Sequence, residues 1–213
     1  MTAETVADVF IIESLRVNDE IEQRYEGRRL ADILRMAGKN PKYFYFQEKK
    51  ELPHILQIFK ESKYRFLHFS CHATLSRIIT TRDFYTYPEF AQELKGVLKL
   101  RRAFFSACEL GNQLFSTCLA GTNKGMHSIT APAEEIRFDH AAAIWSSLYV
   151  SIFTSGKNNV THGDVVKRLK MLGTLFPVDL HFSGYDARND SWEHSKIHKS
   201  SIAVPGPAKG NLV

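Results

Sequence analysis

The sequence predicts an α/β protein, built on a mostly parallel sheet of about six strands with helices on both faces. Strand-like apolar runs alternate with amphipathic, helix-like segments along the chain. Of the 213 residues, 44% are hydrophobic and 12% aromatic, which is enough for one large core. The segments between the central strands are long enough for parallel crossovers, which need about a dozen residues or more.

The first half of the chain contains three expected strands with helices between them. In order, the segments are a strand at 9–15, a helix at 27–38, a strand at 42–46, a helix at 52–63 and a strand at 65–71. Gly38 is a typical helix stop, and Pro53 suits the first turn of the second helix. The run at 65–71 is almost continuously apolar, which favours a central parallel strand covered on both faces.

The second half continues the alternation. The expected segments are a long crossover at 74–99 with a helix beginning near Pro88, a strand at 103–107, a helix at 112–119, a strand at 126–131, helices at 141–153 and 161–175, and a last strand at 179–182. No repeat or linker divides the chain, so we expect a single domain at 1–203. Residues 204–213 contain Pro and Gly at close intervals, which predicts a flexible tail.

The charge, the apolar runs and the cysteines of the sequence argue against a nucleic-acid-binding, a membrane-spanning or a secreted protein. The net charge of +5 comes from basic residues spread along the chain, which is typical of a solvated surface and makes nucleic acid an unlikely partner. No apolar run approaches the roughly 20 residues of a membrane-spanning helix. Acidic residues in the first thirty positions argue against a signal peptide, so we expect a cytoplasmic protein whose three cysteines are thiols. No motif predicts a cofactor.

Two strand-like runs end on residues that carry chemistry. FLHFSCHA at 66–73 ends on Cys71 and His72, and RRAFFSACELGN at 101–112 contains Cys108. Functional groups of parallel sheets collect beyond the carboxyl ends of the strands. If the two strands are neighbours, their ends lie about 5 Å apart, close enough for His72 and Cys108 to share a substrate. Successive side chains of a strand point to opposite faces, so Cys71 cannot easily act with His72.

A cysteine and a histidine in this arrangement suit nucleophilic catalysis. The reactive species is the thiolate, and a neighbouring histidine either accepts the proton or stabilises the anion. Acyl transfer also requires N–H donors for the developing oxyanion, which backbone groups at a strand end can supply. We therefore expect Cys108 and His72 to act as a pair, with Cys71 and Cys118 in packing roles.

These two motifs resemble the CHAT branch of the caspase-like cysteine peptidases, which are relatives of separase in clan CD. In that family a strand ending in Cys-His-Gly precedes a strand ending in Ser-Ala-Cys-Glu, and the order of elements over about 8–155 also matches. The resemblance implies a three-layer α/β/α sandwich. It also implies that Cys108 is the nucleophile and that His72 is the acid and base. Cys71 then corresponds to a structural strand position.

The resemblance further implies a cytoplasmic cysteine endopeptidase that cleaves a protein or peptide substrate without a cofactor. It also implies a bacterial stress or defence role, controlled by a regulatory protein or by homo-oligomerisation. Backbone amides at Ala73 and Cys108 would form the oxyanion hole. Ala73 departs from the family, which usually has glycine after the histidine. That departure keeps open a second hypothesis, in which an inactive caspase-like module acts through protein–protein interaction.

The sequence offers weaker candidates for substrate and metal binding. Glu13 ends the first strand, and there its carboxylate would either favour a basic substrate side chain or simply face solvent. Glu109 would either orient the site or cap the helix that follows. A zinc site formed by His68, Cys71, His72 and Cys108 lacks the paired spacing of such sites, and His68 would lie about 13 Å from His72 along the strand. We therefore expect no metal.

Overall fold

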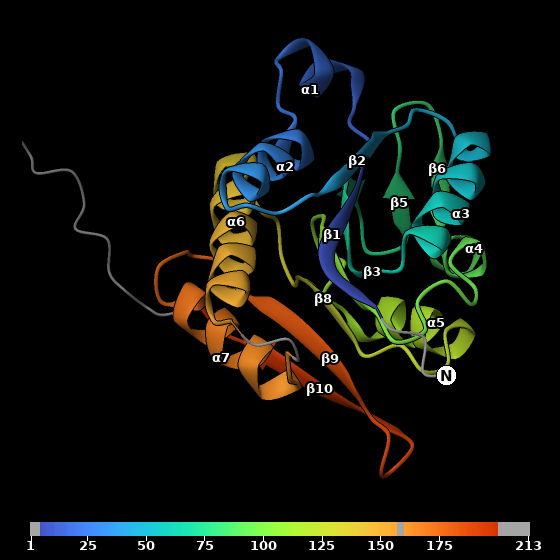
Figure 1. Ribbon diagram of the computed structural model, residues 1–213. Helices are drawn as coiled ribbons and strands as arrows, with labels where there is room; N and C mark the ends of the chain where they lie inside the picture. Colours follow the sequence, from blue (N-terminus) through green and yellow to red (C-terminus); the bar gives the residue numbers. More distant parts are fainter. Residues whose placement is uncertain (1–4, 157–159, 200–213) are drawn as a thin grey trace, which may run out of the picture.

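The computed structural model describes residues 5–156 and 160–199 and contains a seven-stranded sheet in the order β10-β9-β8-β7-β3-β1-β2. The first five strands along the chain that belong to this sheet, β1, β2, β3, β7 and β8, run parallel to one another. This arrangement confirms the predicted class, a three-layer α/β/α sandwich around a mostly parallel sheet (Figure 1).

The elements follow the predicted alternation closely. The strands of the main sheet are β1 (Val6–Glu13), β2 (Lys42–Tyr45), β3 (Tyr64–Ser70), β7 (Arg102–Ser106), β8 (Ser128–Pro132), β9 (Leu180–Asp186) and β10 (Ser191–Ile197). The helices are α1 (Val17–Ile21), α2 (Glu26–Met36), η1 (Lys49–Glu51), α3 (Leu52–Ser62), α4 (Tyr87–Glu93), α5 (Gln113–Thr122), α6 (Phe138–Thr154) and α7 (His162–Gly173).

Two hydrophobic cores lie on opposite faces of the sheet. On one face, α2, α6 and α7 cover alternate strand residues, including Phe66 and Phe104. On the other face, α3, α4 and α5 cover residues such as Leu67 and Phe105. Both faces of the central strands are therefore apolar, and this explains their near-continuous hydrophobic sequences. Figure 1 shows the two helix layers to either side of the sheet.

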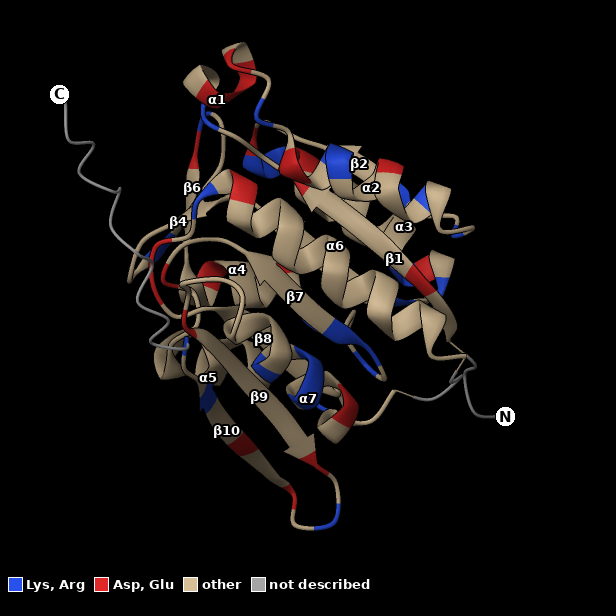
Figure 2. Cartoon of the chain, turned by 90° about the vertical axis from the view of Figure 1, so that its left-hand side faces the viewer, with Lys and Arg blue, Asp and Glu red and all other residues tan. Residues whose placement is uncertain are grey.

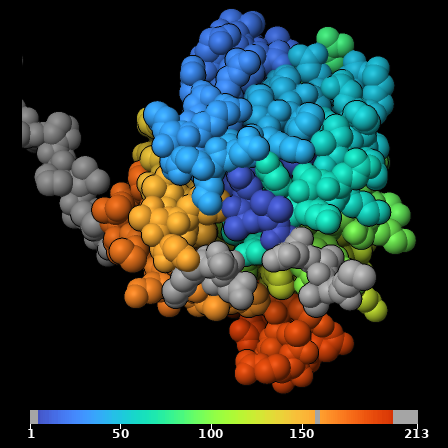
Figure 3. Space-filling model, in the orientation of Figure 1, coloured from blue at the N-terminus to red at the C-terminus, as the bar shows by residue number. Residues whose placement is uncertain are grey.

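The C-terminal edge of the sheet differs from the prediction. The sheet has seven strands rather than about six, because β9 is longer than expected and turns back into β10, which was not predicted. β9 pairs antiparallel with both β8 and β10. β10 is the edge strand and is largely exposed, so its sequence lacks the apolar run of a buried strand. The end of this hairpin projects from the body of the molecule (Figure 3).

A small second sheet lies in the crossover after β3, where an irregular segment was expected. It contains β4 (His72–Ala73), β5 (Arg77–Ile79) and β6 (Phe84–Thr86) in the order β4-β5-β6. The strands are only two or three residues long, which is too short for a periodic pattern to be visible in the sequence. This sheet matters for function because β4 carries His72.

In Figure 2, charged residues of both signs lie on α2 and α7, in keeping with solvated surfaces, whereas α6 is almost uncharged. In the described ranges, no helix has the length and apolarity needed to cross a membrane. The predicted flexible tail at 204–213 lies outside the described residues.

Candidate active site

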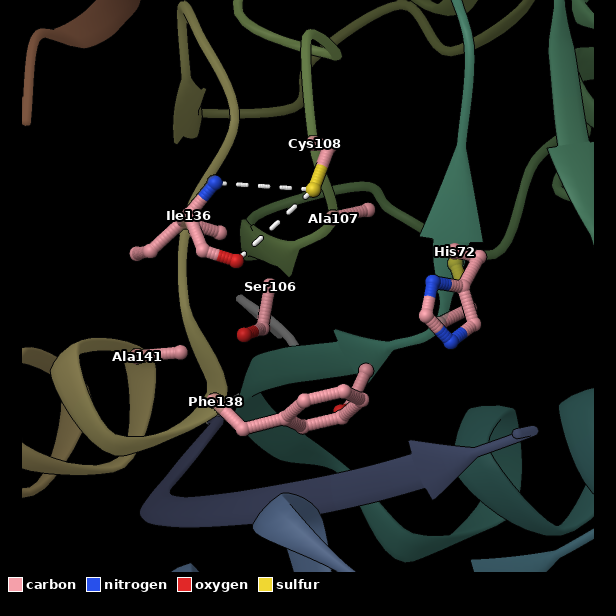
Figure 4. A pocket seen from close by; sticks show the side chains of 9 residues that line it. His72, Ser106, Ala107, Cys108, Ile136, Phe138 and Ala141 are labelled. Carbon is pink, nitrogen blue, oxygen red and sulfur yellow. Dashed lines mark hydrogen bonds between the residues drawn. The ribbon is translucent and has the colours of Figure 1, made fainter. Parts of the chain in front are cut away.

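His72 and Cys108 line the same pocket, at the carboxyl ends of β3 and β7. The two strands are neighbours and pair up to Ser70 and Ser106, two residues before the histidine and the cysteine. The side chains on the α6 side of both strands therefore continue into the pocket. Its walls are Ser70, Cys71, His72, Ser106, Ala107, Cys108, Ile136, Phe138 and Ala141 (Figure 4).

The thiol of Cys108 contacts the backbone of Ile136, in the loop that leads to α6. The N–H of Ile136 donates to Sγ at 3.5 Å, and Sγ lies 3.8 Å from the carbonyl oxygen of the same residue. In Figure 4 the thiol points toward Ile136, and the ring of His72 lies across the pocket. The Ile136 N–H is therefore placed to stabilise a thiolate, whereas the carbonyl accepts from the neutral thiol.

The imidazole of His72 is held by a carboxylate that was not predicted from the sequence. Nε2 of His72 lies 2.7 Å from Oδ2 of Asp19, at hydrogen-bonding distance. Burial lowers the pKa of His72 below its ordinary value, and the hydrogen bond to Asp19 offsets part of that effect. With Nε2–H donating to the carboxylate, Nδ1 is left as the acceptor, which is the tautomer a general base requires.

Asp19 is positioned by a short segment that is tied to β2. It lies in α1 and is 6% exposed, and Arg24 contacts its other oxygen at 3.2 Å. The neighbouring Glu20 accepts a hydrogen bond from the hydroxyl of Tyr45 and another at 2.9 Å from Nε2 of Gln47. These bonds fix α1 against the end of the sheet, so the position of Asp19 does not depend on solvent-exposed contacts alone.

Cys71 has the character of a packed thiol. It is 7% exposed and belongs to the core on the α3, α4 and α5 face of the sheet. Burial raises the pKa of the Cys71 thiol far above its ordinary value, and the nearby Cys108 and Glu26 add to this effect. Although Cys71 reaches one wall of the pocket, it is a poor source of thiolate at neutral pH.

The turn after Cys108 is specified by three residues. Glu109 has a φ of +61°, a left-handed conformation that is uncommon outside glycine. A Cβ on Gly111 would lie 2.6 Å from the carbonyl oxygens of Ala131 and Pro132, so only glycine fits there. Asn112 caps α5 by accepting from the N–H of Phe115 at 2.8 Å.

Glu109 is not among the residues that line the pocket. The cap of the following helix comes from Asn112 rather than from Glu109, which corrects that alternative. The Nδ2 of Asn112 also donates to the Glu109 carbonyl at 2.7 Å. A role of the Glu109 side chain in substrate binding stays a prediction.

The expected position of Glu13 in the crevice is wrong. Its side chain is fully buried and binds the N-terminus of α2, where the N–H groups of Gly27 and Arg28 donate at 2.6 and 3.3 Å. The hydroxyl of Tyr43 donates a third hydrogen bond at 2.7 Å. Glu13 ends β1 beneath the first turn of α2, so it fixes this helix and does not face a substrate.

Ionisation of Glu13 is expected to destabilise the folded protein. Burial raises the pKa of Glu13 to about 7 from an ordinary 4.5, partly opposed by the Tyr43 hydrogen bond. The folded state therefore holds this proton more tightly, and stability is lost as the pH rises from about 4.5 to 7. Because each tenfold difference in proton affinity corresponds to about 1.4 kcal/mol, the free energy of unfolding falls by about 3 kcal/mol over this range.

Urea unfolding of the wild type and of Glu13→Gln between about pH 4 and 8 measures this loss. We expect the free energy of unfolding of the wild type to fall relative to that of the variant as the pH rises, since glutamine does not titrate. Taking the difference removes the contribution of the histidines, which titrate in both proteins. A difference that is independent of pH would contradict the assignment.

Comparisons with known proteins support the same architecture. The sequence matches no protein-family model and no curated protein. Among solved structures, a secreted C11 cysteine protease from Bacteroides thetaiotaomicron, "iotapain", aligns with a TM-score of 0.54 and 10% identity. The alignment covers 84% of this chain and 66% of that chain, so this chain spans just under two thirds of the protease.

Caspase-1 from Spodoptera frugiperda aligns with a TM-score of 0.52 and 13% identity, over 79% of this chain and 77% of that chain. The fold of this chain is caspase-like. Identities of 10% and 13% support the fold, but the CHAT subtype inferred from the two motifs stays a prediction.

In this caspase-like fold, Ala73 occupies the position where the CHAT motif has glycine. Ala73 is in β4 and has no positive φ, so a Cβ costs nothing in backbone conformation here. Thr74 N–H donates to the Arg77 carbonyl at 2.9 Å, which makes that pair hydrogen-bonded. Hydrogen-bonded and non-hydrogen-bonded pairs alternate along an antiparallel ladder. The next pair, Ala73 and Ile78, is therefore non-hydrogen-bonded, and the N–H group of each residue points away from the opposite strand. The Ala73 N–H is therefore not taken up by β5, and its oxyanion role stays a prediction.

Within the described part of the chain, no three His, Cys, Asp or Glu side chains are placed to hold a metal ion. His68, one of the four residues considered for a zinc site, is fully buried, and the centroid of its ring lies 5.6 Å from that of Trp145.

Sequence reasoning missed Asp19 because nothing local distinguishes it. It is 53 residues from His72 and stands among other acidic residues, Glu20 and Glu22, that would ordinarily face solvent. The available signal was its place just after the first strand, at the same edge of the sheet as the other strand ends.

Proposed function

We propose that this protein is a cysteine endopeptidase in which Cys108 is the nucleophile, His72 the acid and base, and Asp19 the residue that positions His72. The observation that carries the proposal is the single pocket lined by Cys108 and His72, with the imidazole anchored on a buried carboxylate. The caspase-like fold, shared with two solved cysteine peptidases, supports it.

The reaction follows from these positions. The Cys108 proton passes to Nδ1 of His72, and the thiolate attacks the scissile carbonyl carbon to form a C–S bond. N–H groups such as those of Ala73 and Cys108 stabilise the oxyanion. The C–N bond then breaks as His72 returns the proton to the leaving amine. Water, activated by His72, hydrolyses the thioester and restores the thiol.

The thiol must leave Ile136 before it meets His72. Cys108 Sγ lies within hydrogen-bonding reach of the Ile136 backbone, and a rotation about its Cα–Cβ bond moves it into the pocket. We infer that substrate or a partner favours this rotation. The resting contact equally fits the second hypothesis, an inactive caspase-like module that works by binding another protein.

Control by a regulatory protein or by self-association, in the cytoplasm, completes the proposal, together with the CHAT-like stress or defence role. Val17 and Ile21 are exposed apolar residues on α1, the helix that carries Asp19. A contact there would act on His72 through a single hydrogen bond, so α1 offers a short route for activation.

Thiol labelling separates the two hypotheses. We expect iodoacetamide or a peptidyl acyloxymethyl ketone to modify native Cys108 at least about tenfold faster than Cys71 or Cys118, because a positioned imidazole promotes its thiolate. The rate should rise with pH, because the thiolate is the reactive form of a cysteine. Peptide mapping by mass spectrometry identifies the modified residue.

The matched control is Cys118→Ala, which should leave the fast phase intact, whereas His72→Ala should slow it. Modification of Cys108 only after denaturation would refute the peptidase and support the binding module.

A further inference from the structure

A second pocket, of about 240 Å³, lies between the end of α5 and the β9–β10 hairpin. This hairpin pocket shares no residue with the pocket of Cys108. It is at the amino end of β8, where Gly184 pairs with Ser128, whereas Cys108 follows the carboxyl end of β7. The residues of its lining that matter here are Gly121, Lys124, Tyr185, Asp190 and Trp192.

One wall of the hairpin pocket is a pair of half-buried aromatic rings. Tyr185 and Trp192 are directly opposite each other on β9 and β10, and their ring centroids are 5.7 Å apart. Trp192 also packs against the core on the α5 face of the sheet, which fixes its ring. The faces of aromatic rings attract cations, and tryptophan does so most strongly. This wall therefore suits a positively charged group.

A carboxylate lies beside the two rings. The hydroxyl of Tyr185 donates to Oδ1 of Asp190 at 2.6 Å, which holds the carboxylate at the pocket. No described residue donates to Oδ2 of Asp190, and none forms an ion pair with it. One oxygen of a positioned carboxylate is thus available to a ligand.

The turn of the hairpin is folded without help from Asp190. Asp186 accepts from the N–H of Arg188 at 3.0 Å and from Nδ2 of Asn189 at 2.8 Å, and these bonds close the turn. Arg188 also pairs with Asp186 rather than with Asp190. The basic residue of the turn therefore leaves the charge of Asp190 unneutralised.

The opposite wall is the carboxyl end of α5, where backbone carbonyls carry partial negative charge. Ala120 and Gly121 of the last turn line the pocket. Asn123, which is buried, holds this end in place: its Nδ2 donates to the Leu119 carbonyl at 3.1 Å, and its Oδ1 accepts from the N–H of Gly96 at 3.1 Å. Both walls of the hairpin pocket thus favour a cation, and both are fixed before a ligand arrives.

The size and openness of the hairpin pocket indicate what kind of molecule brings the cation. Pockets that enclose a whole drug-sized ligand measure about 300 to 1,000 Å³, so about 240 Å³ suits a single side chain. Gly121, Lys124 and Asp190 are exposed at its edge, and the hairpin end projects from the body of the molecule (Figure 3). A side chain on the surface of another protein can therefore enter while its backbone stays outside.

We propose that the hairpin pocket binds an arginine side chain of a partner protein. The guanidinium plane stacks on Trp192, two of its N–H groups donate to Asp190, and the others face the carbonyls at the end of α5. A lysine ammonium has neither the plane nor the fork of donors, and an acidic side chain would be repelled by Asp190. This site goes beyond the proposed peptidase function and does not depend on it.

Titration of the full-length Cys108→Ala protein, which cannot cleave the probe, tests the site by nuclear magnetic resonance. The chain has two tryptophans, so the indole N–H signal of Trp192 is read beside that of the fully buried Trp145 as an internal reference. The probes are acetyl-Gly-Arg-Gly-amide and the same peptide with citrulline, which keeps the shape of arginine and removes its charge. We expect the Trp192 signal to report about tenfold tighter binding of the arginine peptide, with the Trp145 signal unmoved.

Three further substitutions locate the binding energy. Asp190→Asn should weaken binding of the arginine peptide about tenfold. Glu193→Gln is the matched control, because it removes the same charge from the next strand position after Trp192, on the other face of the hairpin, and it should change nothing. Lys124→Gln should strengthen binding, because Lys124 is a basic residue at the pocket edge and forms no ion pair with the described residues.

Equal affinity for the two peptides, or tighter binding of a peptide with aspartate in place of arginine, would overturn the cation site. Free L-arginine that binds more than about tenfold tighter than the peptide would assign the pocket to a small molecule and overturn the protein partner. If Asp190→Asn fails to fold, the comparison of peptides on the Cys108→Ala protein still decides. None of these readouts requires turnover, so a failure of the peptidase proposal is seen separately, in the labelling of Cys108.

Discussion

Replacing Cys108 with alanine is expected to abolish peptide hydrolysis, with a loss of roughly a thousandfold or more in kcat/KM. In the proposed mechanism, Cys108 is the residue of the pocket lining that attacks the scissile carbon. Ser106 and Ser70, the hydroxyls nearby, lie nearer the floor and precede the two reactive positions. A continuous assay with a fluorogenic peptide measures the loss.

Cys71→Ala is the matched control, because it removes a neighbouring thiol from the same pocket. We expect it to keep activity within about threefold of wild type, since burial keeps Cys71 protonated. An inactive Cys71→Ala together with an active Cys108→Ala would reverse the assignment. Circular dichroism and thermal unfolding of both variants separate lost chemistry from lost structure.

The sheet could be predicted well where its strands are buried on both faces. β3 and β7 are largely apolar and buried, and the candidate residues His72 and Cys108 follow directly from where these strands end. Alternation along β3 also predicts that Cys71 and His72 lie on different faces of the sheet. The structure agrees, since Cys71 belongs to the core on the α3 face.

Prediction was poorer where pairing depends on distant contacts. β4 is two residues long, and only its partners β5 and β6 make it a strand. β10 is a strand because its backbone pairs with the edge of β9, whereas its own residues are mostly polar and exposed. Such elements are decided by tertiary context, which local periodicity does not contain.

The acidic residues after β1 illustrate the same limit within the site. Glu13, Asp19 and Glu26 all lie within fourteen positions and look alike in the sequence. The structure gives each a different environment: Glu13 binds the end of α2, Asp19 binds His72, and Glu26 is buried without a hydrogen bond from the described residues. Of the three, only Glu13 sits at a strand end, and for that reason it alone was predicted to bind substrate.

Replacing Asp19 with asparagine is expected to lower kcat/KM by about a hundredfold or more. The carboxylate accepts from Nε2–H of His72 and so leaves Nδ1 free to take the Cys108 proton. An asparagine amide can instead donate to Nε2, which places the proton on Nδ1 and removes the base. The change is nearly isosteric, so the fold and the contact with Arg24 have little reason to alter.

The pH profile distinguishes this role from a structural one. Asp19 raises the pKa of His72 against the effect of burial, so its loss should move the acid limb of kcat/KM to lower pH while the plateau falls. Glu22→Gln, on the same exposed segment but without contact to His72, should change neither the limb nor the plateau. If kcat/KM fell equally at every pH and the acid limb of its pH profile did not shift, Asp19 would only hold α1 in place. A shifted limb would show that the charge itself acts on the imidazole, and that a partner bound at α1 could set the activity through this one contact.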